Sequence, residues 1–433
     1  MSEVSMHDDR EDEEEQQRRE EDGEFLDPSS ALDVIPDEAA DDDHPMSDVE
    51  DDNDDGEGEG DEDEEIDMSN NSTTYFDKHT DSIFLVDLHP TLPLVVTGGG
   101  DDTGYVWTSH LVPPKLVTTL SGHTDSLVAG GFSPDGEWLV TGGMDGQVRI
   151  WRAHKRGQMW EFRDGLAEVD EVTWLAFHPT QPVFAFGAAD SSAWVYSLAP
   201  KLDSLCVLYG HGGACTAGVF TPATSGDEEE INLLTASEDG TVISWSVPSG
   251  AQNFKLGPAQ FHYEAPWVNL NLHPSGTSVA VGSADGKVAI IGTRSGSVIA
   301  TVDVVGAVGA GAGGPRELTE EERSVEGIAW CESLNVLAVG LVGGIVCIFD
   351  TGSWRVRRTL EAGDAVTKIA FVPGTTELVA SGMDGVLRRW DVRTGTELWR
   401  GTGHSQGVLG FALSRDGQTL VSASDEGVAL VYK

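Results

Sequence analysis

Positive charge is scarce in this chain of 433 residues. It has 26 Lys and Arg side chains against 74 Asp and Glu, and its formal net charge is -48. DNA, RNA and anionic membranes would repel this excess of carboxylates, which excludes direct binding to any of them as a main activity. A partner rich in Lys and Arg is favoured instead. The alternative is that the charge only keeps the chain soluble.

Cysteine is also rare, and its pattern argues against a metal site. Four cysteines occur, at Cys206, Cys215, Cys331 and Cys347. None belongs to a Cys-x-x-Cys pair, and none is framed by His at the spacing of a zinc site. We therefore expect ordinary reduced thiols in an intracellular protein, with no metal and no cofactor.

Long apolar runs are missing as well. The longest candidate, Val302 to Gly314, consists mostly of Gly, Ala and Val and is too short to span a bilayer. The chain is charged from Glu3 onward, which predicts that no secretory signal is present. We expect a soluble monomer in the cytoplasm, with the nucleus as a second compartment.

The acidic residues divide the chain into two zones. Residues 1–70 contain 33 Asp and Glu against three Arg, and Phe25 is their only aromatic residue. Such a segment cannot bury enough apolar surface to offset the entropy of ordering, so residues 1–71 should form a disordered acidic tail. Residues 72–433 consist of short alternating runs of Val, Leu, Thr and Trp, punctuated by Asp-Gly turns, and predict an all-β domain.

One motif recurs through residues 72–433. It leads from a Gly-His pair through two apolar strands and an Asp-Gly turn to a closing aromatic or apolar residue, and neighbouring closing residues are 41 to 58 positions apart. The closing residues are Trp107, Trp151, Tyr196, Trp245, Ile291, Phe349, Trp390 and Tyr432. This period is typical of WD repeats, each of which forms a four-stranded blade. We predict an eight-bladed β-propeller, or seven blades if the irregular sixth repeat, with Gly343 in place of the turn acid, is not a blade.

Some repeats contain four polar side chains that can form a hydrogen-bonded chain inside one blade. The sets are His79, Thr97, Asp101 and Trp107; His123, Thr141, Asp145 and Trp151; and His211, Thr235, Asp239 and Trp245. The third repeat and the fifth to eighth lack part of the set and must rely more on packing. Because most His and Asp residues occupy such positions, and no nucleophile has a suitable partner, we do not expect an enzyme.

The end of the last repeat predicts how the ring closes. Lys433 directly follows the third-strand residue Tyr432, so the last blade lacks a fourth strand. The segment Thr73–Phe76 has strand composition and can supply it, which would remove an exposed sheet edge. Two insertions, Ser225–Glu230 and Gly306–Glu322, should form mobile surface loops.

A propeller presents a flat face around its central channel, and two positions of each repeat should point to it. Registration of the repeats places Glu171, Glu326 and Phe84 at the start of first strands, and Glu238, Asp425, Met144 and Met383 directly before turn acids, with Trp267 close by. The loops that lead into the first strands contain Asp81, Asp125, Asp170 and Asp364. Trp330 is a further candidate but aligns with Phe132, which also allows a core position. Such an acidic face with aromatic and Met contacts suits the Arg, Lys and Tyr side chains of an extended basic peptide. A merely solvating acidic surface is the alternative.

Several stretches resemble one particular WD-repeat family. Asp87–Pro90, Val96–Asp102 and Tyr105–Trp107 resemble the first repeat of the angio-associated migratory cell protein, and Gly403-His404 with Phe411–Asp416 resembles its last repeat. The acidic tail and the irregular blades are similar too, so the resemblance covers essentially the whole chain. The fungal members of this family are the Sqt-type ribosome-assembly chaperones.

The resemblance implies a function. The chain would be a dedicated chaperone that binds the basic N-terminal segment of the large-subunit ribosomal protein L-ten (universal name uL-sixteen) and delivers it for assembly of the 60S particle. It identifies no contact residue. Two other functions stay open, namely a signalling or migration scaffold with several partners, and a histone-binding propeller.

Overall fold

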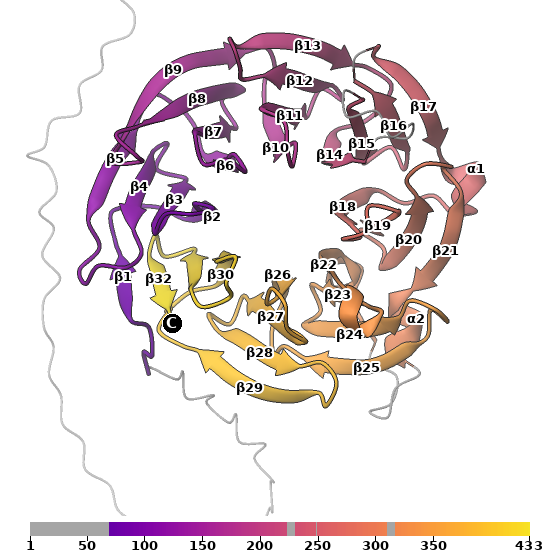
Figure 1. Ribbon diagram of the computed structural model, residues 1–433. Coiled ribbons are helices and arrows are strands. Elements are labelled where there is room, and N and C mark those ends of the chain that lie inside the picture. Colours follow the sequence, from indigo (N-terminus) through magenta and orange to yellow (C-terminus); the bar gives the residue numbers. More distant parts are fainter. Residues whose placement is uncertain (1–68, 223–229, 248, 310–316) are drawn as a thin grey trace, which may run out of the picture. The chain divides into compact units, whose positions relative to one another are not determined.

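The computed structural model describes residues 69–222, 230–247, 249–309 and 317–433. The expected disordered tail lies outside these residues except for its last three, and so do most of the insertion from Ser225 and the middle of the one from Gly306. The described residues form eight four-stranded antiparallel sheets, arranged as the blades of a ring (Figure 1). The prediction of an eight-bladed propeller is confirmed, and the sixth repeat forms a complete blade.

In each blade the first strand lies at the central channel and the fourth at the rim (Figure 1). Blades 1 to 4 contain β2 (Ile83–Leu88), β3 (Leu94–Gly99), β4 (Gly104–Thr108) and β5 (Leu116–Leu120); β6 (Leu127–Phe132), β7 (Trp138–Gly143), β8 (Gln147–His154) and β9 (Met159–Ala167); β10 (Val172–Phe177), β11 (Val183–Ala188), β12 (Ala193–Ser197) and β13 (Asp203–Leu208); β14 (Cys215–Thr221), β15 (Asn232–Ser237), β16 (Val242–Ser246) and β17 (Ala251–Leu256).

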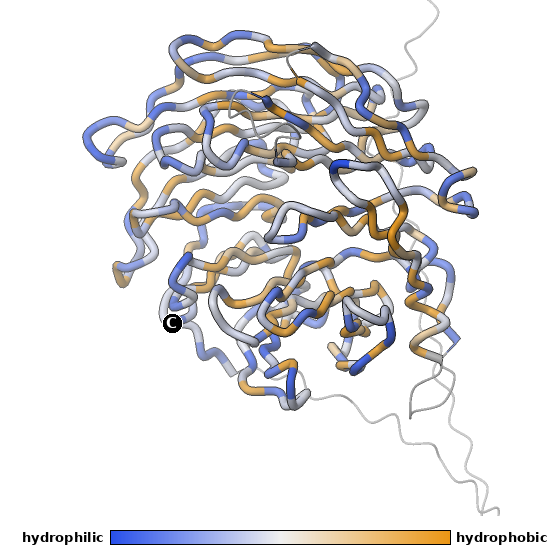
Figure 2. The backbone as a smooth tube through the Cα atoms, turned by 45° about the vertical axis from the view of Figure 1, so that its right-hand side comes forward, coloured by the Kyte–Doolittle hydropathy of each residue, from blue (hydrophilic) through white to orange (hydrophobic). Residues whose placement is uncertain are grey.

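Blades 5 to 8 contain β18 (Trp267–Leu272), β19 (Ser278–Ser283), β20 (Lys287–Gly292) and β21 (Val298–Asp303); β22 (Val325–Cys331), β23 (Val336–Leu341), β24 (Ile345–Asp350) and β25 (Val356–Glu361); β26 (Val366–Phe371), β27 (Glu377–Gly382), β28 (Leu387–Asp391) and β29 (Thr396–Gly401); β30 (Val408–Leu413), β31 (Leu420–Ser424), β32 (Ala429–Tyr432) and β1 (Thr74–Phe76). Figure 2 shows hydrophobic stretches within the strands and hydrophilic residues at many of the turns.

Short helices lie in the connections between strands. They are α1 (Pro258–Phe261), α2 (Val304–Gly309) and two 3-10 turns, Glu321–Arg323 and Glu332–Leu334. In the described ranges no helix has the length and apolarity needed to cross a bilayer. All four cysteines are free thiols, and three of them are buried.

The ring closes as predicted. Strand β1 pairs antiparallel with β32, with Thr74 opposite Val431 and Phe76 opposite Ala429. The Phe76 ring stacks on Trp107 of blade 1 with centroids 4.7 Å apart and planes 2° from parallel. Just before the strand, the Asn71 side-chain amide donates a hydrogen bond to the Arg400 carbonyl at 2.7 Å. Segments from near both ends of the sequence therefore join blades 7, 8 and 1.

The predicted hydrogen-bonded chain is complete in blade 1. His79 bonds Asp101 through Nδ1 and Thr97 through Nε2, both at 2.9 Å, and the Trp107 indole N–H donates to the Thr97 hydroxyl at 3.2 Å. Blade 8 has a variant in which His404 bonds Glu426 and Ser422, both at 2.6 Å. These bonds satisfy polar groups inside the blade and fix its geometry.

Two predicted sets differ in detail. In blade 2, His123 bonds Asp145 and Thr141, but the buried Trp151 indole nitrogen has no hydrogen-bond partner, so that chain is one bond shorter than predicted. In blade 4, Trp245 and His211 both bond Thr235, whereas the His211 Nδ1 atom bonds the Thr241 hydroxyl, which in turn donates to Asp239. Thr241 therefore bridges His211 and Asp239, which the sequence pattern predicts to bond directly.

The difference between the indoles predicts a difference in stability. Trp107→Phe and Trp245→Phe remove a buried hydrogen bond, whereas Trp151→Phe removes none. We expect the first two substitutions to cost about 1 kcal/mol more than the third in the free energy of unfolding, measured in urea. Equal losses in all three variants would contradict this assignment.

The buried histidines make the propeller sensitive to acid. Desolvation lowers the pKa of His211 from its ordinary value of 6.5 to about 4, and it lowers the pKa of His79 and His123 too. The unfolded chain takes up these protons near pH 6.5, whereas folded His211 resists protonation down to about pH 4, so stability is full above pH 6.5 and is lost as the pH falls toward 4.

For His211 alone the expected loss is about 3 kcal/mol across this window. Urea unfolding at a series of pH values should show a shallower slope for His211→Gln than for the natural chain. Val112→Gln, a change at an exposed residue that does not titrate, should leave the slope unchanged. A slope that His211→Gln does not alter would count against the assignment.

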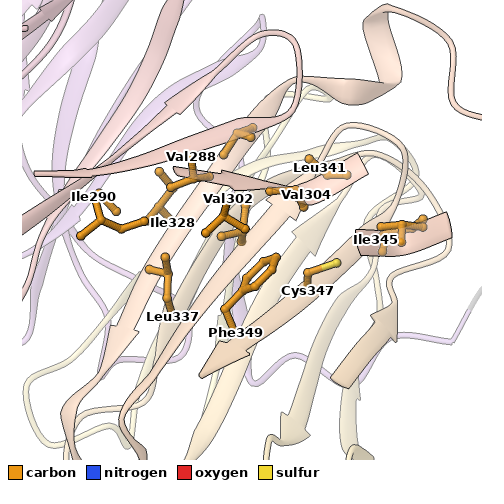
Figure 3. Close-up of a cluster of buried hydrophobic side chains, with 14 of the residues drawn as sticks. Val288, Ile290, Val302, Val304, Ile328, Leu337, Leu341, Ile345, Cys347 and Phe349 are labelled. Carbon is orange, nitrogen blue, oxygen red and sulfur yellow. The ribbon is translucent and has the colours of Figure 1, made fainter. Parts of the chain in front are cut away.

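Blade 6 lacks the hydrogen-bonded set and is held by packing. The strand register places Val339, Cys347 and Phe349 where blade 1 has Thr97, Tyr105 and Trp107. All three are buried and belong to one apolar cluster with residues of blade 5. Figure 3 shows Cys347 and Phe349 in this cluster together with Val288 and Ile290 of blade 5. Apolar volume replaces the polar chain, which explains how a degenerate repeat still forms a blade.

Candidate partner-binding face

The loops that lead into the first strands and the turns between second and third strands lie on one face, which we call the top face. Every first strand has an irregularity at its second residue, where the pairing with the second strand skips one position. These eight residues, the inner ring, are Phe84, Val128, Thr173, Thr216, Val268, Glu326, Thr367 and Leu409. A β-bulge redirects side chains at such a point, here beside the mouth of the channel.

A second set of eight residues lies just outside the inner ring. In every blade the residue before the turn acid, or before Gly343 in blade 6, donates its backbone N–H to the carbonyl of the residue that precedes the first strand, at 2.9–3.2 Å. These residues, the outer ring, are Gly100, Met144, Ala189, Glu238, Ala284, Val342, Met383 and Asp425. The repeated bond holds each turn against its neighbouring loop, so the rings are rigidly supported.

The structure brings most of the predicted site residues to these rings. Phe84 and Glu326 belong to the inner ring, and Glu238, Asp425, Met144 and Met383 to the outer ring. Except for the half-buried Glu326, all of them are exposed.

Two predicted positions differ from the structure. The Glu171 carbonyl accepts the N–H of Ala189, which places Glu171 in the row before the first strand; Thr173 is its blade's inner-ring residue. Glu171 therefore lies on the top face, but two residues before the inner-ring position that was predicted for it. Trp267 is only 1% exposed and packs edge-on against Phe261 in the core between blades 4 and 5.

The prediction of Trp267 as a surface contact is therefore wrong. Trp267 is the first residue of its strand, the position that the fully buried Ile83 and Leu127 occupy in blades 1 and 2. Trp330 is buried as well, and its indole N–H donates to the Asn271 carbonyl at 3.0 Å. The core interpretation of Trp330 is thus confirmed.

The two rings contain acidic residues and no Lys or Arg. Asp425 accepts a hydrogen bond from the Ser82 hydroxyl at 2.5 Å, and Glu326 accepts one from Ser324 at 2.8 Å. Each carboxylate has further lone pairs that can accept hydrogen bonds from a guanidinium or ammonium group. The loop acids Asp81, Asp125, Asp170 and Asp364 are exposed on the same face.

The channel wall contains two charged residues that the sequence analysis did not predict. Lys368 directly follows the inner-ring residue Thr367, and its ammonium lies 5.7 Å from the centre of the Phe411 ring. Surrounding protein lowers the pKa of Lys368 by desolvation, and the negative charge of Asp87 opposes this shift. Burial raises the pKa of Asp87, which accepts the backbone N–H of Phe132 at 2.8 Å. Both residues interrupt the apolar composition of their strands, which was the available signal.

Other polar side chains at the rings join neighbouring blades. The Thr216 hydroxyl donates to the Trp267 carbonyl at 2.8 Å, and the Thr367 hydroxyl donates to the Val408 carbonyl at 2.6 Å. In the described parts of the chain, no three His, Cys, Asp or Glu side chains are grouped so that they could hold a metal ion. The ring acids can accept hydrogen bonds from cationic groups, and the exposed Phe84, Met144 and Met383 can contact apolar groups.

The repeats and most of the chain are similar to those of known proteins. The model of the WD domain, G-beta repeat, matches residues 70–108, 114–152, 354–391 and 395–433. The ribosome assembly protein SQT1 of Saccharomyces cerevisiae is 38% identical over 387 residues, which cover 85% of this chain and 88% of that protein. The human angio-associated migratory cell protein is 28% identical over 369 residues, with 83% and 80% covered.

Solved structures agree with the sequence relatives. The crystal structure of Saccharomyces cerevisiae Sqt1 superimposes with a TM-score of 0.78 at 37% identity, over 84% of this chain and 99% of that one. Chaetomium thermophilum Sqt1 bound to the N-terminus of the ribosomal protein L10 gives 0.72 at 29% identity, over 84% and 100% of the two chains. The chain therefore belongs to the WD-repeat family that includes the Sqt1 ribosome assembly proteins and the angio-associated migratory cell proteins.

Proposed function

We propose that this protein is a chaperone that binds the basic N-terminal segment of the large-subunit ribosomal protein L10 on its top face and delivers it for assembly of the 60S particle. The observation that carries the proposal is the charge of the two rings, which contain Glu326, Glu238 and Asp425 and no basic residue. The complex of the related Chaetomium thermophilum Sqt1 with the N-terminus of L10 supports it.

The arrangement of these residues suits an extended basic segment. The three acids come from blades 4, 6 and 8, whereas the apolar ring residues Phe84, Met144 and Met383 come from blades 1, 2 and 7. Arg or Lys side chains can bind the carboxylates through charge-assisted hydrogen bonds. Their aliphatic stems, or a Tyr ring, can pack on Met and Phe. A segment held in this way is shielded from nucleic acid and from aggregation.

The proposal includes the mode of action and the compartment. The protein would act as a monomer, by binding and not by catalysis, because its polar clusters serve to build blades. It would act in the cytoplasm, where ribosomal proteins are synthesised. Top-face contacts would include Glu171 at the margin of the rings.

A binding experiment with the full chain tests the proposal. Fluorescence anisotropy should show tight binding of a labelled peptide with the N-terminal sequence of L10 from the same organism, with an affinity that falls as salt is added. A peptide with its Arg and Lys replaced by Gln should not bind. Equally tight binding of a histone-tail peptide would contradict a dedicated chaperone and favour a histone-binding propeller.

A further inference from the structure

The rim of the propeller has a hollow of about 550 Å³ between blades 1 and 2. One wall is the connection of residues 109–115 between β4 and β5, another is the turn at Leu92–Leu94, and the third is the tip of the hairpin formed by β8 and β9. Strands β5 and β9 lie side by side at this rim (Figure 1). We call this hollow the rim groove.

The rim groove is lined by basic residues, although the chain as a whole is strongly acidic. Its lining includes His110, Lys115 and Arg156 but no Asp or Glu, in a chain whose net charge is -48. In the described residues neither Lys115 nor Arg156 forms an ion pair with a carboxylate. By contrast, Arg357 and Arg393 at the rim of blades 6 and 7 pair with neighbouring aspartates. Unpaired cations on an acidic protein leave a local site for anionic groups.

Exposed apolar side chains border these cations. Val112 is 68% exposed, and Leu111 and Leu116 beside it are also exposed. A second hollow shares Leu116 with the rim groove and is lined by Val112 and by Tyr75, which is 56% exposed. Large apolar groups gathered on a surface beside charges are typical of a protein-binding site.

The walls of the rim groove are held in place by hydrogen bonds and packing. The Lys115 N–H donates to the Thr108 hydroxyl at 2.9 Å, and the Ser109 N–H donates to the Pro93 carbonyl at 3.0 Å. A Cβ on Gly157 would come within 2.6 Å of the Leu92 side chain, so the hairpin tip already packs against the wall. A site that is fixed before binding loses little conformational freedom when a ligand arrives.

We propose that the rim groove docks an acidic peptide segment with aliphatic or aromatic residues, carried by a partner other than the basic one on the top face. Carboxylates of the segment would bind Lys115 and Arg156, and its apolar side chains would pack on Leu116 and Val112. A nucleic acid fits less well, because the groove offers aliphatic walls, whereas single strands need a series of stacking rings. Because the groove lies at the rim, one protein can hold a basic cargo and an acidic partner at the same time.

The test uses the full chain and a labelled peptide in which Asp and Glu alternate with Leu and Phe. Fluorescence anisotropy should show saturable binding that Lys115→Glu with Arg156→Glu weakens by about tenfold or more, equivalent to at least ~1.4 kcal/mol. Leu116→Ser with Val112→Ser should weaken it similarly. Arg355→Glu, a change at an exposed arginine of blade 6, should not. All variants should bind the basic L10 peptide as before, so this proposal can fail while the proposed function stands.

Four outcomes would overturn the proposal. A peptide of Asp and Glu alone that binds equally well would show that only unspecific charge attraction acts. Tighter binding of single-stranded RNA would identify a different ligand. If sedimentation shows a dimer, and the Lys115 and Arg156 changes abolish it, a second copy of the chain is the occupant of the groove. If the peptide binds only after residues 1–68 are removed, that segment of the same chain, and not a separate partner, occupies the rim groove in the native protein.

Discussion

Replacing Glu326 and Glu238 together by lysine should weaken binding of the basic L10 segment by about a hundredfold or more. A hydrogen bond to a charged group contributes roughly 1.5–3 kcal/mol, and each reversal removes such contacts and adds repulsion. Asp425 would then be the one acid left in the two rings. The measurement is the dissociation constant of the labelled peptide at low and at moderate salt.

The substitutions should leave the ring folded. Glu238 is exposed, and the Glu326 side chain accepts one hydrogen bond from Ser324. A substitution at the exposed Glu238 should change the free energy of unfolding by less than about 0.5 kcal/mol, and loss of the Ser324 bond at the half-buried Glu326 should cost about 1 kcal/mol more. Circular dichroism and the urea midpoint should therefore change little. A loss of binding that came with unfolding would say nothing about the top face, which is why both measurements are needed.

Two single reversals serve as controls. Glu332→Lys changes the same charge in blade 6, but on the turn between its first and second strands, away from the top face, and should reduce affinity less than threefold or so by the general field alone. Glu171→Lys, at the margin of the rings, should have an intermediate effect. If Glu332→Lys weakens binding as much as Glu326→Lys does, or if no reversal has an effect at low salt, the acidic-face proposal is wrong.

The fold could be predicted from the sequence because a propeller is specified by repetition. A closing residue at regular intervals marks each blade, even where Phe349 replaces Trp and Gly343 replaces the turn acid. The short segment before the first repeat has strand composition, and it pairs with β32 as the fourth strand of blade 8. These are properties of spacing, which a single sequence displays in full.

The site was predictable in part, for a reason that lies in the first strands. The bulge at the second residue of each first strand inserts one extra residue, so the alternation of buried and exposed side chains along the strand does not identify the residue that faces the channel mouth. Glu326 and Phe84 occupy the bulge, whereas Glu171 precedes its strand and Trp267 begins one. Whether a Trp at a strand end faces solvent or the next blade depends on packing between blades, which the sequence of one repeat does not contain.

Contacts between distant side chains were the least predictable features. Thr241 inserts itself between His211 and Asp239, and Trp151 lacks its expected bond, although both repeats contain the full set of residue types. Lys368 and Asp87 interact electrostatically from blades 7 and 1. Differences of an ångström decide such contacts, and residue spacing does not resolve them.

Phe76→Ala should be the most destabilising single change at the ring closure, with a loss of about 3–5 kcal/mol. The side chain is buried, stacks on Trp107 and lies 5.7 Å from the Tyr105 ring. It is the main apolar anchor of β1, which has only three residues. Once β1 detaches, the backbone groups of β32 form an unpaired edge, so the variant should also self-associate.

The adjacent residue on the same strand is a matched control. Tyr75 is exposed, and Tyr75→Ala should cost less than about 1 kcal/mol, because it removes an aromatic ring that packs little against the blade. Urea unfolding compares the stabilities, and static light scattering reports self-association. Equal losses for the two variants would mean that β1 contributes strand pairing alone. The ring would then be closed by the backbone ladder of Thr74–Phe76 with Ala429–Val431, independently of the Phe76 stack.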